Sequence, residues 1–167
     1  MSTLLIEGGR RLSGRIQVEG NKNAALPLIA ACLLTEQECV LSNVPRIRDV
    51  EIMAQLLASL GAEIEGVGTS TLTIRCPELL THEPDASLVG RLRGSVLLMG
   101  PLLARTGKAS LAAPGGDFPA RRTIVTHVEA LMSMGAREVQ CTNGTWRKSC
   151  RARVPFVCPP AFAPLRK

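Results

Sequence analysis

The chain contains almost no aromatic residues: Phe, Trp and Tyr together make up 2% of its 167 residues, and Tyr does not occur. The apolar fraction is nevertheless 46%. A hydrophobic core must therefore be built from Leu, Ile, Val, Ala and Met side chains. The length fits one ordinary domain that is large enough to bury such a core.

Long hydrophobic runs are also missing. No stretch reaches the roughly 18 uncharged apolar residues that a membrane-spanning helix needs. Residues 1–7 contain neither a basic segment nor the apolar centre of a secretory signal. We therefore expect a cytoplasmic protein that has no membrane partner.

The cysteines lack the spacing of a metal site. They form no Cys-x-x-Cys pair, and no His lies at ligand spacing from them. In a cytoplasmic chain such cysteines are by default reduced thiols, which argues against a zinc site or a disulfide framework. The six residues are Cys32, Cys39, Cys76, Cys141, Cys150 and Cys158.

Acidic residues are absent from the end of the chain. All fourteen of them precede Thr145, whereas six of the twenty basic residues lie from Arg147 onward. Residues 1–144 therefore carry equal numbers of both charges, and the net charge of +6 belongs to the C-terminal residues. Nucleic-acid binding needs basic residues clustered on folded elements, so we expect no nucleic-acid partner.

Residues 145–167 differ in composition from everything before them. They hold four prolines, two cysteines, the only Trp and two of the three Phe, and they show no apolar periodicity. A segment without such a pattern offers nothing to pack. We interpret it as an irregular, disordered tail, of the kind an aberrant C-terminus would give; the alternative is a genuine basic binding tail.

The first half of the chain predicts an α/β structure. Short or alternating apolar runs predict strands over residues 15–19, 39–44, 62–65 and 71–75, the last two as a hairpin. Apolar residues at helical spacing predict helices over 23–34 and 50–60. We place Pro27 in the first turn of one helix, and Asp49 and Gly61 at the two ends of the other.

The same pattern recurs further along the chain. The expected elements are helices over 95–104 and 123–134 and a strand over 109–112. The segment Leu131-Met132-Ser133-Met134-Gly135-Ala136 matches Leu57-Ala58-Ser59-Leu60-Gly61-Ala62. We therefore predict two strand–helix repeats, about residues 12–76 and 88–144, within a domain over residues 1–144.

The second repeat contains an insertion, Pro114-Gly115-Gly116-Asp117-Phe118-Pro119-Ala120-Arg121-Arg122. Repeats vary least where they pack, so an insertion in one copy suggests a function. A polar connector over residues 77–87 separates the two repeats.

Two glycine-containing loops carry the candidate site residues. Lys22 and Asn23 follow Gly20 and open a helix, where an ammonium and a helix N-terminus could act on one anion. Lys22 could instead be a solvated turn residue, and Asn23 could cap the helix rather than bind a ligand. The second loop carries Asp117, which could donate a proton to a substrate or could simply be a turn aspartate.

Further basic residues lie near these loops. Arg91 and Arg93 precede an apolar helix, and arginine suits phosphate or carboxylate groups, although both could be surface residues. At most one of the two is expected to reach a site, and we choose Arg93. His127 is interpreted as a structural residue and His82 as a solvated one.

Several motifs together resemble the UDP-N-acetylglucosamine enolpyruvyl transferase (1-carboxyvinyltransferase) family. They are Gly-x-Lys-Asn-Ala-Ala-Leu-Pro at 20–27, Asn43-Val44-Pro45 with Asp49, Arg93-x-Ser95, Gly100-Pro101-Leu102, and Pro-Gly-Gly-Asp at 114–117. The resemblance runs from about Leu5 to Gly144. It implies repeated strand–helix units of an inside-out α/β barrel, with part of one lobe present.

The resemblance also implies an activity. The family transfers the enolpyruvyl group of phosphoenolpyruvate to the 3-hydroxyl of UDP-N-acetylglucosamine and releases phosphate, the first committed step of peptidoglycan synthesis, without a metal or other cofactor. Lys22 and Asn23 match its phosphoenolpyruvate-binding pair, and Asp117 matches its proton donor. The positions that match UDP-N-acetylglucosamine-binding residues are Arg93, Arg122, Thr123, Ile124, Val125 and Thr126.

This sequence departs from the family pattern in two respects. The usual proton donor is a cysteine, and Asp117 removes the thiolate that fosfomycin alkylates, which predicts resistance to that drug. Family members also have two lobes of three repeats each, with the active site in the cleft between them. The resemblance covers about two repeats of one lobe, so a catalytically incompetent, sugar-nucleotide-binding remnant is the alternative function.

Overall fold

The computed structural model describes residues 3–9, 11–112, 115, 125–138 and 154–157. The first repeat consists of α1 (Lys22–Ala31), η1 (Cys32–Leu34), β1 (Cys39–Ser42), α2 (Arg48–Ser59), β2 (Glu63–Glu65) and β3 (Thr71–Arg75). After a connector that includes the short helix α3 (Ala86–Val89), the second repeat consists of η2 (Arg93–Leu98), α4 (Met99–Thr106), β4 (Lys108–Leu111), α5 (Val125–Ser133), β5 (Arg137–Glu138) and β6 (Val154–Val157).

Each repeat contributes one antiparallel three-stranded sheet. The strand order is β1-β3-β2 in the first sheet and β4-β6-β5 in the second, so the third strand of each repeat lies between the first and the second. The register pairs Cys39 with Ile74 in the first sheet and Lys108 with Val157 in the second. The two sheets therefore share one topology, and β6 lies beyond residue 144, where the sequence predicts the end of the second repeat.

The strand β6 differs from the irregular tail that we expected over residues 145–167. Its four residues pair with β4 on one side and with β5 on the other. The segment Val-Pro-Phe-Val is rich in strand-forming residues, although it is too short to show a periodicity by itself. The other residues of the expected tail lie outside the described part of the chain.

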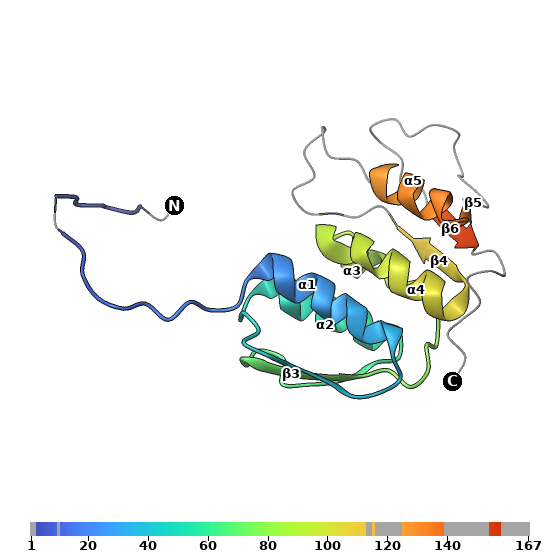
Figure 1. Cartoon of the computed structure of the whole chain (residues 1–167), viewed down its shortest axis with the longest axis horizontal. Helices are drawn as coiled ribbons and strands as arrows, with labels where there is room; N and C mark the ends of the chain where they lie inside the picture. Colours follow the sequence, from blue (N-terminus) through green and yellow to red (C-terminus); the bar gives the residue numbers. More distant parts are fainter. Residues whose placement is uncertain (1–2, 10, 113–114, 116–124, 139–153, 158–167) are drawn as a thin grey trace.

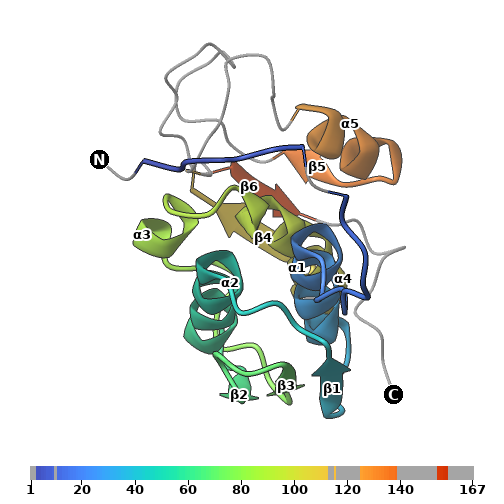
Figure 2. The same cartoon turned by 90° about the vertical axis from the view of Figure 1, so that its left-hand side faces the viewer.

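Helices α1, α2 and α4 lie together between the two sheets (Figures 1 and 2). The core is aliphatic, as the composition predicts. The largest completely buried side chains are Ile29, Leu33, Met53, Leu56, Leu57, Leu60, Leu72, Ile74, Leu98, Met99 and Leu102. Contacts of η2 with both α1 and α2 join the two repeats through this shared core.

The predicted strand over residues 15–19 is wrong. The segment before α1 has no regular secondary structure and extends away from the body of the molecule (Figure 1). Ile16 and Val18 are 91% and 76% exposed. Alternating apolar residues make a stable strand only when a neighbouring strand supplies hydrogen bonds and cover, and the described residues supply neither.

Two predicted helix features also differ from the structure. The helix α2 begins at Arg48 with Ile47 as its N-cap, so Asp49 lies in the first turn and does not cap the helix. The helix α1 begins at Lys22, which places Pro27 beyond the first turn. Pro27 has no N–H to donate to the carbonyl of Asn23, four residues before it.

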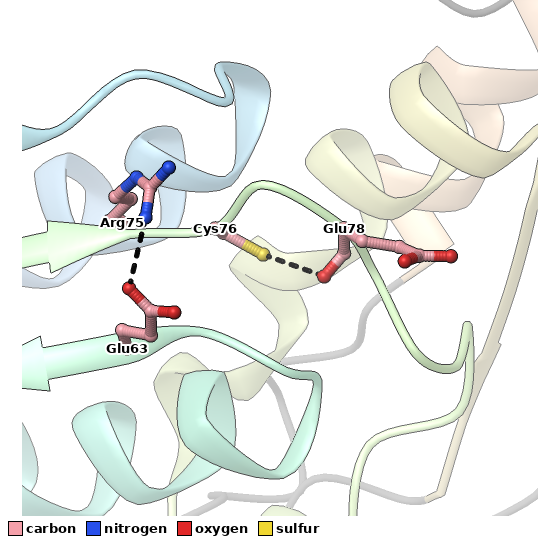
Figure 3. A network of polar contacts seen from close by, with 4 residues as sticks. All are labelled: Glu63, Arg75, Cys76 and Glu78. Carbon is pink, nitrogen blue, oxygen red and sulfur yellow. Dashed lines mark hydrogen bonds and ion pairs between the residues drawn. The ribbon is translucent and has the colours of Figure 1, made fainter.

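Arg105, near the end of α4, joins the second repeat to the first. Its guanidinium donates hydrogen bonds to the carbonyl oxygens of Leu33 (3.3 Å), Cys76 (2.7 Å) and Pro77 (3.0 Å). Figure 3 shows the neighbouring end of β3, where the Cys76 thiol donates to the Glu78 carbonyl. One side chain therefore satisfies three carbonyl groups of the first repeat and its connector.

Candidate functional site

The entry of the chain into α1 is packed tightly against the turn that precedes α2. A Cβ atom at Gly20 would lie 1.8 Å from the carbonyl oxygen of Asn43 and 3.0 Å from Cδ of Pro45. Asn43 itself has a positive φ of 55°, which asparagine tolerates better than most residues. Only glycine fits position 20, and this close approach brings the N-terminal ends of α1 and α2 together.

Lys22 and Asp49 meet at this junction. Their side chains form an ion pair between Lys22 Nζ and Asp49 Oδ2. Lys22 is the first residue of α1, and Asp49 lies in the first turn of α2. The sequence places both residues in family motifs, but it gives no sign of this contact. The two residues have 26 residues between them, and composition does not reveal the bend at Asn43 that brings them together.

Asn23 is not the helix cap. That role belongs to Asn21, whose side-chain oxygen accepts a hydrogen bond of 2.7 Å from the backbone N–H of Asn23. Of the two roles considered for Asn23, capping is therefore excluded. Its side chain is exposed beside Lys22 at the start of α1, where it can offer amide donors and an acceptor to a ligand.

Arg93 lies at the start of the second repeat. It is the first residue of η2, which packs against α1. A Cβ atom on the next residue, Gly94, would lie 3.0 Å from Cδ1 of Leu26, in the second turn of α1. Arg93 is half-buried, whereas Arg91 is exposed in the turn that follows α3.

One residue of the inserted segment, Gly115, lies in the described part of the chain. Its N–H donates a hydrogen bond of 3.1 Å to the carbonyl of Val89, and a side chain at position 115 would overlap Gly90. The contact places the backbone of Gly115 beside the segment that leads to Arg93. Neither glycine was singled out in the sequence for this contact, which depends on a close approach between distant segments.

Several predicted site residues lie outside the described part of the chain: Asp117, Arg122, Thr123 and Ile124. Val125 is the first residue of α5, and Thr126 is exposed on its first turn. The structure therefore places Lys22 and Asn23 at the start of α1 and Arg93 at the start of η2, which packs against α1, while the roles of all these residues stay predictions.

The two histidines lie on other parts of the chain, His127 in α5 and His82 in the connector after β3. His127 is exposed on α5, and the backbone carbonyl of the exposed His82 accepts a hydrogen bond from the N–H of Ser110 in β4. Within the described ranges, no three His, Cys, Asp or Glu side chains are grouped so as to hold a metal ion. Among those residues there is also no helix of the length and apolarity that a bilayer crossing requires.

Known proteins are similar to this chain in sequence and in fold. The family model described as EPSP synthase (3-phosphoshikimate 1-carboxyvinyltransferase) matches residues 6–152. The UDP-N-acetylglucosamine 1-carboxyvinyltransferase of Bradyrhizobium diazoefficiens is 50% identical over 133 residues, which are 80% of this chain and 31% of that protein. The protein of the same name from Hydrogenovibrio crunogenus is 42% identical over 86% of this chain and 34% of its own length. The chain thus spans about a third of the curated relatives that it matches.

Parts of solved structures have a fold similar to that of this chain. The enolpyruvyl transferase NikO from Streptomyces tendae has a TM-score of 0.69 at 24% identity, over 90% of this chain and 31% of that structure. EPSP synthase from Acinetobacter baumannii has a TM-score of 0.58 at 17% identity, over 84% of this chain and 31% of that structure. These likenesses confirm the predicted fold class, a part of the inside-out α/β fold. The chain belongs to the EPSP synthase family of carboxyvinyltransferases.

Proposed function

We propose that this chain carries part of the active site of a cytoplasmic enzyme that transfers the enolpyruvyl group of phosphoenolpyruvate to the 3-hydroxyl of UDP-N-acetylglucosamine. The strongest support is the junction of α1 and α2, where an ammonium and an exposed amide stand at helix N-termini. The curated relatives named for this sugar nucleotide support the choice of acceptor. Such an enzyme acts in peptidoglycan synthesis.

The chemistry of phosphoenolpyruvate suits this junction. The molecule carries a phosphate and a carboxylate on one rigid three-carbon unit, so it needs positive charge and directed hydrogen-bond donors. Helix N-termini and Lys22 supply the charge, and the Asn23 amide supplies donors. We assign Arg93 and residues 122–126 to the sugar nucleotide.

We assign Asp117 as the proton donor. In the addition step, the 3-hydroxyl oxygen bonds to C2 of phosphoenolpyruvate, and Asp117 gives a proton to the methylene carbon, which becomes a methyl group. In the elimination step, the C2–O bond to phosphate breaks and the methyl group returns a proton to the Asp117 carboxylate, which restores the double bond and the acid. The base that accepts the hydroxyl proton is expected from the part of the relatives that this chain does not span.

An aspartate in this role has a pharmacological consequence. Fosfomycin is an epoxide that reacts with a nucleophilic thiolate, and Asp117 offers a much weaker nucleophile. We therefore propose that an enzyme containing this chain resists fosfomycin.

A second candidate function is binding without turnover. It is favoured by one observation, the span of about a third of the curated relatives. A partial site would hold phosphoenolpyruvate or the sugar nucleotide weakly and would release no phosphate.

Phosphate release from phosphoenolpyruvate and UDP-N-acetylglucosamine separates these functions. The proposed enzyme releases phosphate only when both substrates are present, and Asp117→Ala lowers the rate by at least about 100-fold because a general acid is lost. Asp117→Cys is the matched variant: it should retain activity and become sensitive to fosfomycin. Substrate-dependent release that persists in Asp117→Ala would contradict the assigned donor. No release from an enzyme that contains this chain, together with measurable ligand binding, would establish the binding function instead.

A further inference from the structure

Lys22 occupies a position that is unfavourable for a cation. As the first residue of α1, it adds positive charge to the positive end of the helix dipole. The first turn of α1 contains no acidic residue that would offset this charge. The compensating carboxylate comes instead from another helix, because Asp49 in α2 pairs with Lys22.

Stability does not explain this ion pair. The side chains of Lys22 and Asp49 are 53% and 30% exposed, and pairs with that much solvent access stabilise proteins little. A charge in an unfavourable place, held by a pair of little structural value, marks a residue that is kept for a ligand.

Asp49 changes the freedom of Lys22. A lysine side chain has a flexible four-carbon stem, and without a partner its ammonium would move widely in solvent. The pair fixes one of the three N–H donors and leaves the others for a ligand. The tight packing of Gly20 on Asn43 fixes the two helix ends relative to each other, so the ammonium is held in a defined place beside Asn23.

We propose that Asp49 is a positioning residue for Lys22 and that it makes the site prefer phosphoenolpyruvate to free phosphate. The inference rests on the proposed function and deepens it. Phosphoenolpyruvate has two anionic groups at a fixed separation, so it gains from an ammonium that is fixed relative to Asn23. Free phosphate, the product, is a single anionic group that can bind the ammonium in many positions, so its affinity gains less from a fixed ammonium. The preference would favour release of the product over retention.

Simple charge repulsion predicts the opposite trend, which makes the inference testable. The Asp49 carboxylate repels both ligands, and it repels phosphoenolpyruvate more strongly because that ligand carries an additional carboxylate. If repulsion were the only effect, Asp49→Asn would increase the preference for phosphoenolpyruvate. If positioning dominates, the same substitution decreases it.

The experiment measures the Kd of phosphoenolpyruvate and of inorganic phosphate by calorimetry for the full chain at constant ionic strength. In Asp49→Asn we expect the ratio of the two affinities to fall about two- to tenfold, the effect of releasing one long side chain. Asp49→Glu keeps the charge and should restore part of the ratio. Glu51→Gln is the matched control, because it removes an exposed carboxylate from the same first turn of α2 and should leave the ratio unchanged.

A second measurement reports on Lys22 without any ligand. Nitrogen-15 relaxation of the side-chain ammonium should show Lys22 ordered in the unsubstituted chain and in Asp49→Glu, and mobile in Asp49→Asn. Urea unfolding of each variant verifies that the fold is intact.

The outcomes separate this inference from the proposed function. An unchanged or increased preference for phosphoenolpyruvate in Asp49→Asn would overturn the positioning role and leave the proposed function standing. Equal affinity of the unsubstituted chain for the two ligands would contradict the proposed site itself. A Lys22 ammonium that is equally mobile with and without Asp49 would overturn the positioning role whatever the affinities.

Discussion

The two repeats have the same topology but different connections. In the first repeat, residues 43–47 join β1 to α2 and residues 66–70 join β2 to β3. The corresponding connections of the second repeat are residues 112–124 and 139–153. Both sheets nevertheless have the same strand order. The packed elements therefore repeat, while the added length lies in the connections.

This difference separates structural from chemical roles. The second helix ends in the same way in each repeat, with the N–H of Ala62 donating to Leu57 and that of Ala136 donating to Leu131. The proposed proton donor, by contrast, lies in a connection that the first repeat does not match. Duplicated units supply a scaffold in this family member, and an insertion in one unit supplies the proposed acid.

The largest expected effect concerns the junction between the repeats. In Arg105→Met, three carbonyl groups lose a charged donor, and hydrogen bonds to charged groups contribute more than neutral ones. We expect the free energy of unfolding in urea to fall by about 3 kcal/mol.

Arg75→Met is the matched control for this prediction. Arg75 pairs with Glu63 at 3.4 Å on the exposed face of the first sheet (Figure 3). An exposed pair of this kind contributes at most about 1 kcal/mol. Equal losses in the two variants would contradict the role of Arg105 in joining the repeats.

The next prediction compares the glycines that follow the second helix of each repeat. Gly61 and Gly135 have φ values of 104° and 100°, a conformation that L-residues with side chains avoid. Alanine should cost about 1–2 kcal/mol at either position. Gly61→Ala should cost more, because its Cβ would also lie 3.0 Å from the Glu78 carbonyl oxygen.

Hydrogen exchange resolves this prediction repeat by repeat. Protection of the Ala62 amide should fall in Gly61→Ala, and protection of the Ala136 amide should fall in Gly135→Ala. A substitution at either glycine that leaves protection intact would show that the two helix ends are not equivalent.

Most of the fold could be predicted from the sequence, because its signals are local. Apolar spacing identified α1 and α2, and the match between residues 57–62 and 131–136 identified the repeat. The strand expected over residues 15–19 does not form, because an alternating sequence describes only one of the two strands that must pair. The strand β6 was missed for the converse reason, since its partners β4 and β5 are distant in the sequence.

The candidate site could be predicted only in part. Lys22 and Asn23 were identified because they open a helix after a glycine, which is a local pattern. The pairing of Lys22 with Asp49 and the contact of Gly115 with Gly90 depend on how separate segments approach each other. No periodicity or composition records such an approach, so the structure was needed to find both.

The smallest expected effect is a pH dependence that arises in the first repeat. Burial, and then the neighbouring Cys39 thiol, raise the pKa of Cys32 to about 12. In the unfolded chain this thiol ionises at its ordinary value, so between pH 8 and pH 10 the unfolded state loses a proton that the folded state keeps. The free energy of unfolding should therefore fall as the pH rises, by about 1–2 kcal/mol at pH 10 for this thiol.

Denaturant midpoints at a series of pH values, under reducing conditions, measure this slope. Tyr does not occur in the chain, so no phenol titrates in this range. Cys32→Ala lowers stability at pH 7 by leaving a small cavity, but it should flatten the decline between pH 8 and pH 10. The described part of the second repeat contains no cysteine. The pH dependence that arises from the described thiols therefore comes from the first repeat and from Cys76, the residue that follows it. An undiminished slope in Cys32→Ala would assign the effect to other groups and remove this difference between the repeats.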